Sequence, residues 1–375
     1  MAALSFKDIG SPPSRHALPL CGLRLLAFGL PDNAPMLAPC HLVIPFATCP
    51  SGESRQVFAG LNLPHLKQLL TQLTHSTWDT GSAHSFSPPH ERVLAQRHGL
   101  AHPGAGGRDG LIPWGSLYAA QAAKSGLAGA GDGELDSTDT ASTAWAVITP
   151  CHWSLQTNHI VLPDPALLQV QEDESRALLA AMRPYFAEDG ITLRYERPAR
   201  WLAQGAVFRN LPTASPDRAI GRNIHDWLPQ TPEGKNLRRL QNEMQMLLYT
   251  HPVNDARAAR RQDAVNAFWI SGTGALPSGA APLHLGGVCL ADGLRTAALC
   301  EDWAAWGQAW QQLDAGECAT LLQTLATNKS ATLTLCGERN AVTHRFESGH
   351  MFQRLCAKFS NPLGRVASID KQGQP

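Results

Sequence analysis

The sequence predicts an α/β protein with a mixed sheet flanked by helices. Short apolar runs bounded by turn residues, which are typical of buried strands, recur along the whole chain. Segments with apolar residues at helical spacing lie between these runs. Strands and helices mixed in this way, and joined by irregular loops, indicate an α/β or α+β sheet fold, and we take the α/β alternative. At 375 residues, of which 43% are hydrophobic, the chain is long enough for a large core and two lobes.

Residues 1–124 are expected to form the N-terminal part of the core, after a loose tail over residues 1–17. Leucines at helical spacing, with Asn62 before Pro64 as the start signal, indicate the first helix. The expected elements here are a buried strand at 41–47 and helices at 63–73, from residue 87 onward and at 114–124.

Residues 125–143 have the composition of a flexible linker or loop. The stretch SGLAGAGDGELDSTDTAST is rich in small and polar residues and contains almost nothing to bury. Its glycine run follows no strand, so a phosphate-binding loop is not expected there.

Residues 144–280 are expected to form a central lobe with a polar site, and residues 281–375 the C-terminal part of the core and a tail. Trp303, Trp306 and Trp310 recur at helical spacing, which predicts an aromatic stripe in the core. Ordered structure is expected to resume at 145–153. The predicted strands are 191–195, 265–270, 287–290 and 331–335, and the predicted helices are 172–186, 235–250 and 294–313.

Composition excludes several classes of protein. The chain has 31 basic and 31 acidic residues, so binding to nucleic acid through bulk charge is not expected. No segment reaches the roughly 18 apolar residues that span a bilayer, and we expect no membrane association. Nine cysteines without a CxxC pair or a regular framework indicate reduced thiols in a cytoplasmic protein. Neither a P-loop nor a GxSxG elbow occurs, and no cofactor is expected.

A surplus of positive charge lies between residues 222 and 261, where seven arginine and lysine residues accompany four acidic ones. Guanidinium groups bind phosphate or carboxylate through forked hydrogen bonds, so this stretch favours a small anionic or phosphorylated ligand. The alternative is a solvated helix face, in which Arg239 pairs with Glu243 one turn further on.

Polar residues that follow this stretch extend the candidate site. His251 and Asn254 project from a turn that Pro252 fixes, and Asn266 lies in an apolar strand where its amide needs a partner. The candidate ligand-binding residues are Arg222, Asn223, Arg238, Arg239, Asn242, Glu243, His251, Asn254 and Asn266. No catalytic residue and no metal ligand is assigned.

Two smaller clusters are also considered. Cys151 and His152 are adjacent, so on a strand they point to opposite faces and cannot chelate one metal together. A packed thiol is favoured for Cys151, and a nucleophile with a distant histidine base is the alternative. His90 and Glu91, at the expected start of a helix, favour a capping role over catalysis.

Longer motifs resemble a bacterial family. They are RNIHDWLP at 222–229, LRRLQNEMQM at 237–246, HPVN at 251–254 and VNAFWISGTG at 265–274. With shorter stretches at 87–92, 109–114, 149–153 and 184–190, they are similar to proteins called phosphoglycerate mutase or RpfE-type regulatory protein. The likeness covers most of residues 40–340.

A narrower pattern in these motifs, HPVN followed by Arg, Asn, Trp and Gly-x-Gly, resembles the archaeal-type cofactor-independent phosphoglycerate mutases of the alkaline phosphatase superfamily. This resemblance implies an alkaline-phosphatase-like core in reduced form with an added lobe. Those enzymes use two divalent metals to activate a serine nucleophile and to hold the phosphoryl group. Their ligands include an Asp-Gly after the first strand and Asp and His clusters near the C-terminus.

The chain departs from that pattern at both places. The first expected strand is followed by Thr48-Cys-Pro and the last by Cys336-Gly-Glu-Arg, without those ligands. We therefore expect a phosphoglycerate-mutase-like protein that binds a small anionic or phosphorylated ligand and lacks the metal-dependent phosphomutase centre. The alternatives are an active mutase-like isomerase, and a regulatory or interaction protein that acts on a protein partner without catalysis.

Overall fold

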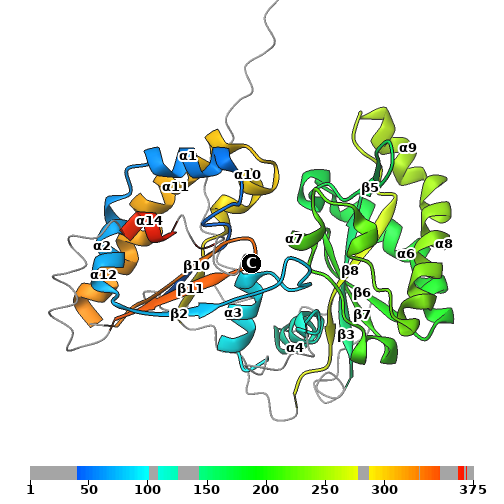
Figure 1. Cartoon of the computed structure of the whole chain (residues 1–375). Helices are drawn as coiled ribbons and strands as arrows, with labels where there is room; N and C mark the ends of the chain where they lie inside the picture. The colour runs from blue at the N-terminus through cyan, green and yellow to red at the C-terminus, as the bar shows by residue number, and fades with distance from the viewer. Residues whose placement is uncertain are drawn as a thin grey trace, which may run out of the picture.

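The structure, a computed structural model, describes residues 40–100, 109–125, 143–277, 287–328, 330–346, 362–366 and 369. The N-terminal tail and nearly all of the expected linker at 125–143 lie outside these ranges. The described residues form two lobes, each built on its own sheet with helices packed against it (Figure 1). The α/β class with a mixed sheet flanked by helices is thereby confirmed.

The first sheet is mixed and has five strands. β1 (His41–Ile44) is parallel to both of its neighbours, whereas β11 is antiparallel to β10 and to β2. Its strands come from both ends of the described chain. The strand order is β2 (His75–Asp79), β11 (Ala341–Arg345), β10 (Thr332–Cys336), β1 and β9 (Val288–Leu290).

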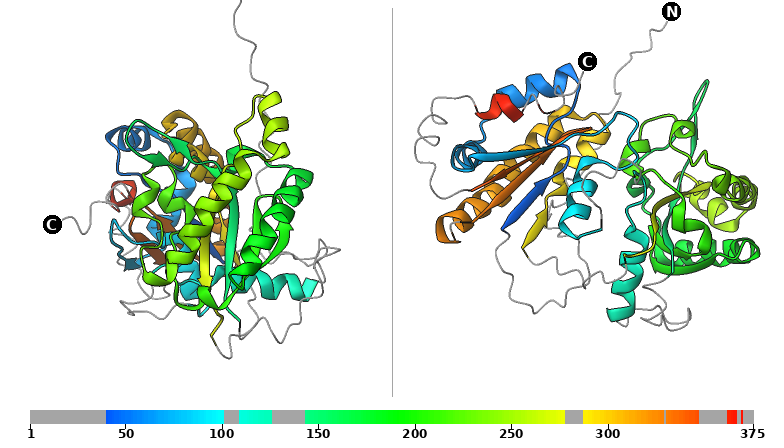
Figure 2. Two further views of the ribbon diagram at one scale, coloured as in Figure 1. Left: turned by 90° about the vertical axis from the view of Figure 1, so that its right-hand side faces the viewer. Right: turned by 60° about the horizontal axis from the view of Figure 1, so that its bottom comes forward.

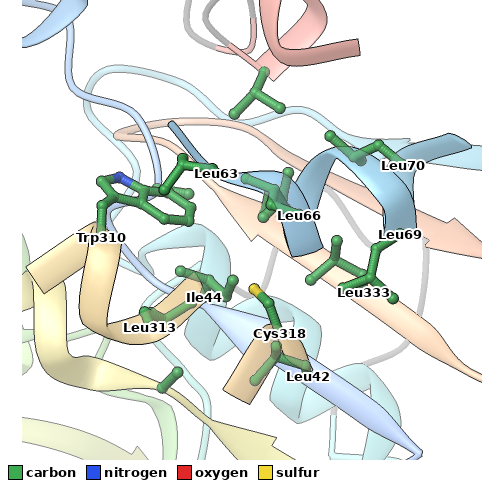
Figure 3. Packing of buried hydrophobic residues seen from close by; sticks show 14 of the residues in the cluster. Leu42, Ile44, Leu63, Leu66, Leu69, Leu70, Trp310, Leu313, Cys318 and Leu333 are labelled. Atoms are coloured by element: carbon green, nitrogen blue, oxygen red, sulfur yellow. The ribbon is translucent and has the colours of Figure 1, made fainter. Parts of the chain in front are cut away.

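Helices cover one face of this sheet and enclose its main hydrophobic core (Figure 3). Trp306 and Trp310 are buried there, as the tryptophan stripe predicts. The single helix predicted over 294–313 is wrong, because Glu301 adopts a left-handed conformation (φ 54°) that breaks it in two. The helices are α1 (Gly52–Gly60), α2 (Pro64–Gln72), α10 (Arg295–Leu299), α11 (Trp303–Leu313), α12 (Ala319–Asn328) and α14 (Pro362–Val366).

The second sheet has four strands, all antiparallel. Its order is β6 (Thr192–Arg197), β7 (Arg200–Gln204), β3 (Trp145–Cys151) and β8 (Ala267–Gly274). Helices α6 (Glu172–Glu188) and α8 (Lys235–Tyr249) pack on one face through buried leucines, while α4 (Trp114–Ser125) contacts β3 and β8. The short pieces β4 (Ser154–Leu155), β5 (Ile160–Val161), α7 (Pro216–Ala219) and α9 (Pro252–Ala259) complete this lobe.

Strand β8 continues beyond the predicted end at residue 270. Gly272 and Gly274 are part of the strand. Gly272 has φ +61° and lies where the register with β3 shifts, which marks a bulge. A Cβ at Gly272 would lie 2.8 Å from the Cβ of Trp114, so this glycine allows α4 to approach the sheet closely.

Two helices face each other between the lobes (Figure 2). α3 (Pro89–Arg97) packs on the first sheet through Val93 and Leu94, on the face that the other helices leave uncovered. α4 belongs to the second sheet and contributes Trp114 to the contact with α3. None of the described helices is both long and apolar enough to cross a membrane.

Candidate functional site

A cavity of about 270 Å³ lies between the two lobes. Pro45, directly after β1, and Leu290 and Asp292, at the end of β9, form its border on the first sheet. Ligands in α/β proteins commonly bind at the carboxyl ends of parallel strands, and the cavity has this position. Its polar lining consists of His90, Glu91, His98, Tyr118, Thr149, Arg200, Asp217, Ser271, Asp292 and Arg295.

Arg295 of α10 joins the two lobes at the cavity wall. Its Nε and Nη2 donate to Oδ1 of Asp217 at 2.8 and 2.6 Å, and its Nη1 donates to Asp164 at 2.8 Å. Burial opposes ionisation of Asp217, but the Arg295 guanidinium outweighs it and lowers the pKa of that carboxyl. The other oxygen of Asp217 lies 3.3 Å from Nε2 of His90. Asp217 is therefore a carboxylate that fixes the orientation of His90.

Glu91 spans the gap between α3 and the second lobe. One carboxyl oxygen accepts a hydrogen bond from the Ser215 hydroxyl at 2.6 Å, and the other accepts from the Trp114 indole at 3.1 Å. Burial raises the pKa of Glu91. The predicted capping role is wrong, because α3 has no side-chain cap and both carboxyl oxygens are used across the lobes.

Arg200 of β7 is the cation on the opposite wall. Its guanidinium lies 3.7 Å from the centroid of the Tyr118 ring and forms an ion pair with Glu196 through Nε and Nη2. Within the described part of the chain its Nη1 makes no hydrogen bond. Burial raises the pKa of the Tyr118 hydroxyl, so the ring faces the guanidinium in its neutral form.

A loop before α3 is fixed by two charged residues. Asp109 accepts hydrogen bonds from the backbone N–H groups of Phe86 and Ser87 at 2.6 and 3.0 Å. Arg218 donates to the carbonyl oxygens of Ser85 and Glu338, at 2.9 Å each. Although burial lowers the pKa of Arg218 to about 10, it stays charged near neutral pH. These contacts position both α3 and the neighbouring Asp217.

None of the nine residues predicted to bind a ligand lines this cavity. Arg222 pairs with Glu338 and lies over the Trp227 ring, whereas Asn223 accepts a hydrogen bond from the His225 backbone. The other two arginines of the set, Arg238 and Arg239, lie on α8. Arg238 donates to the Pro229 carbonyl, and Arg239 pairs with Glu243 at 2.5 Å, the alternative that the helical spacing indicates.

Asn254, Asn266 and His251 of the predicted set have backbone partners. Asn254 donates to two carbonyl groups and accepts from the Val265 N–H at 2.9 Å, and Asn266 pairs with both backbone groups of Trp153. His251 accepts from the N–H of Val253 at the start of α9. Asn242 is exposed on α8. The structure does not bring these residues together, and their role in ligand binding stays a prediction.

Cys151 is fully buried in a hydrophobic cluster, and burial raises the pKa of its thiol far above the usual value. The ring of His152 contacts the Ala264 carbonyl at 2.9 Å. The packed-thiol interpretation therefore holds, and a Cys151 nucleophile is wrong because its thiolate is not accessible.

No metal ligand is assigned at the strand ends, where the resemblance implies a two-metal centre. β1 is followed by Pro45, Phe46 and Ala47, and Glu338 after β10 pairs with Arg222. Among the described residues no group of three or more His, Cys, Asp or Glu side chains could hold a metal ion. We assign no step to a metal.

Comparison with solved structures finds remote likenesses. The chain is similar to a cofactor-independent phosphoglycerate mutase from Thermoplasma acidophilum, with a TM-score of 0.33 and 11% identity over 90% of this chain and 100% of that chain. It is also similar to the PH0037 protein from Pyrococcus horikoshii, with a TM-score of 0.39 and 11% identity over 84% of this chain and 89% of that chain. No model of a known protein family matches the chain, and no curated protein matches it. Likenesses this remote assign no activity to the chain.

Sequence reasoning did not identify the residues that meet in the cavity. Asp217, Arg200 and Arg295 lie in separate segments, and no spacing in the sequence connects them. A partial signal existed, because the stretches 87–92 and 109–114 belong to the motifs with the family resemblance. They contain Glu91 and Trp114, which hydrogen-bond each other.

Proposed function

We propose that this chain binds a small metabolite with one anionic group and neighbouring hydroxyl or carbonyl groups in the inter-lobe cavity. The observation that supports this best is Arg200, a charged side chain in the cavity wall whose Nη1 has no hydrogen-bond partner among the described residues. A guanidinium with one edge still available binds carboxylate or phosphate through that edge.

The other charges of the cavity argue against a ligand that is anionic throughout. Arg295 is neutralised by Asp217 and Asp164, and Asp292 adds a negative charge to the lining. The hydroxyls of Thr149 and Ser271 suit polar, uncharged parts of the ligand. A volume of about 270 Å³ is at the lower end of ligand sites, which suits a metabolite of a few carbon atoms.

We further propose that the chain is a phosphoglycerate-mutase-like protein without the metal-dependent centre of those enzymes. The motifs that resemble that family and the residues after β1 and β10 both support this proposal.

Calorimetric titration with 3-phosphoglycerate, and with glycerate as its counterpart without phosphate, tests the binding proposal. Loss of a hydrogen bond to a charged group costs about 1.5–3 kcal/mol, so Arg200→Gln is expected to weaken 3-phosphoglycerate binding about 10- to 100-fold. Arg176→Gln is the matched control, because Arg176 lies 3.8 Å from the Tyr195 ring and pairs with Glu172, outside the cavity. This control is expected to bind as the wild type does.

Two results would overturn the proposal. One is the absence of binding of either compound to the wild-type chain at millimolar concentration. The other is unchanged affinity in Arg200→Gln together with a loss in Arg238→Ala, which would place the ligand on the surface of α8 instead.

A further inference from the structure

The cavity contains two titratable side chains that anion binding at Arg200 does not use. His90 and Glu91 are neighbours in the first turn of α3, and both line the cavity. His90 is buried and Glu91 is half-buried, and their polar contacts are of opposite kinds. Glu91 accepts hydrogen bonds from two donors, whereas His90 lies against the carboxylate of Asp217.

The contacts of His90 suit a base. Asp217 lies 3.3 Å from Nε2 and is itself anchored by two hydrogen bonds from Arg295. A carboxylate next to one ring nitrogen keeps the proton on that nitrogen, which leaves the lone pair on Nδ1. Within the described chain Nδ1 has no hydrogen-bond partner, so it can accept a proton from a molecule in the cavity.

The environment of Glu91 suits an acid. Burial raises its pKa, and this effect prevails over the opposing effects of His90 and of the hydrogen bonds from Ser215 and Trp114. Asp217 lines the same cavity, yet the Arg295 guanidinium lowers its pKa despite burial. The two carboxyl groups that line this cavity are therefore shifted in opposite directions, which is the pattern of an acid beside an ionised group.

We propose that the cavity catalyses enolisation of a small anionic α-hydroxycarbonyl compound, with His90 as the base and Glu91 as the acid. His90 takes the proton from the hydroxyl-bearing carbon, and the C–H electron pair forms a C=C bond. The carbonyl π pair moves to oxygen, which takes the proton of Glu91, so that an enediol results. His90 then returns its proton to the neighbouring carbon, and Glu91 takes the proton of the other hydroxyl group. Both residues regain their starting state, and no co-reactant is consumed.

The roles of the surrounding residues follow from their contacts. Asp217 and Arg295 are positioning residues, because they act on the substrate through His90. Arg200 supplies the contact to the anionic group, so the proposal rests on the binding function proposed above.

Deuterium uptake from D2O into dihydroxyacetone phosphate, followed by proton NMR, tests the enolisation. The wild-type chain is expected to accelerate uptake over buffer, and Glu91→Gln and His90→Gln are each expected to reduce this acceleration at least about 100-fold. Glu172→Gln is the matched control for the acid, since Glu172 lies in the first turn of α6, exposed and outside the cavity. His225→Gln, at an exposed histidine, is the control for the base. Both controls are expected to retain the wild-type rate.

Calorimetry on the same samples separates a failure of catalysis from a failure of binding. Glu91→Gln is expected to bind dihydroxyacetone phosphate as the wild type does, because glutamine keeps an oxygen and the volume of the side chain. Binding by the wild-type chain without accelerated uptake would overturn the enolisation and leave the binding function intact. Absence of both would overturn both proposals. Unchanged uptake in Glu91→Gln would show that another group is the acid.

A measurement without substrate tests the acid directly. In protein labelled with carboxyl-¹³C glutamate, the Glu91 signal is the one that disappears in Glu91→Gln. Its titration midpoint is expected to lie above about pH 4.3, which is the ordinary pKa of a glutamate. Titration within that range would exclude Glu91 as a proton donor near neutral pH and would overturn the proposal.

Discussion

Replacement of Gly115 by alanine tests the packing that fixes one wall of the cavity. Gly115 is the second residue of α4, between Trp114 and the rest of the helix. An added Cβ would lie 2.7 Å from the carbonyl carbon of Ala146 and 2.8 Å from its Cα and N atoms. All three are backbone atoms of β3, a central strand of the second sheet, so no side-chain rotation can relieve the contact.

Two opposing effects set the size of the change. Alanine is preferred to glycine inside a helix by about 1 kcal/mol. Overpacking against a rigid neighbour costs about 1–3 kcal/mol, and three contacts below 3.0 Å place this substitution near or above the upper value. We expect a net destabilisation of about 2 kcal/mol. At about 2–4 °C per kcal/mol for a lobe of this size, Tm falls by about 4–8 °C.

Thermal and urea unfolding, followed by circular dichroism, measure this change. Gly60→Ala is the matched control, because Gly60 ends α1 and a Cβ there meets nothing within 4 Å. The control is expected to leave Tm unchanged or slightly higher. Equal Tm values for the two variants would refute the close approach of α4 to β3. A second readout is the affinity for 3-phosphoglycerate, which is expected to fall because a displaced α4 moves Trp114 away from Glu91.

Three further predictions concern buried charge and a buried thiol. Asp217→Asn leaves Arg295 with one carboxylate partner, Asp164. The pKa of Asp217 in the folded chain lies below its value of about 3.9 in the unfolded chain. The ionised Asp217 therefore stabilises the fold above that pH, and this stabilisation is lost as the pH falls. Urea unfolding is therefore expected to show a wild-type advantage that is full at pH 7 and shrinks below about pH 4. Arg257→Gln removes one of the two guanidinium partners of buried Glu174 and leaves Arg260 as the other, so it is expected to cost about 1.5–3 kcal/mol in the same assay, and no measurable cost would contradict it. Cys151, whose burial raises its pKa, is expected to resist a thiol reagent at neutral pH until the chain unfolds, and labelling at the rate of an exposed thiol would show otherwise.

Many individual elements were predictable because their residues repeat with the period of the structure. The leucines behind Pro64 predicted α2, and the aromatic stripe of α11 predicted a buried face. Strand β1 followed from a continuous apolar run, as is usual for a strand that is covered on both faces, whereas β10 alternates threonine with leucine. The spacing of the apolar residues shows which side of a helix or strand is buried, and this spacing is present in the sequence of that element alone.

Other elements lack such a local signal. β2 has exposed residues throughout its length, and β11 is partly exposed, so neither shows an apolar run. Both are held by pairing in the first sheet, β2 with β11 and β11 with β10. The break at Glu301 and the bulge at Gly272 also depend on neighbours that are distant in the sequence. The conformational preferences of the individual residues therefore do not predict these features.

The sequence by itself determined the α/β class and the buried faces of the main helices. The tertiary structure alone decided which charged and polar residues meet in the cavity. Arg238 and Arg239 of α8 are satisfied by the nearby Glu243 and Pro229 carbonyl and by the more distant Asp189. Glu91, Asp217 and Arg295 lie far apart in the chain, and the packing of the two lobes brings them to one cavity. Hydrogen bonds and burial depend on which residues are close in space. The spacing of residues along the chain predicts such proximity only within one helix or strand.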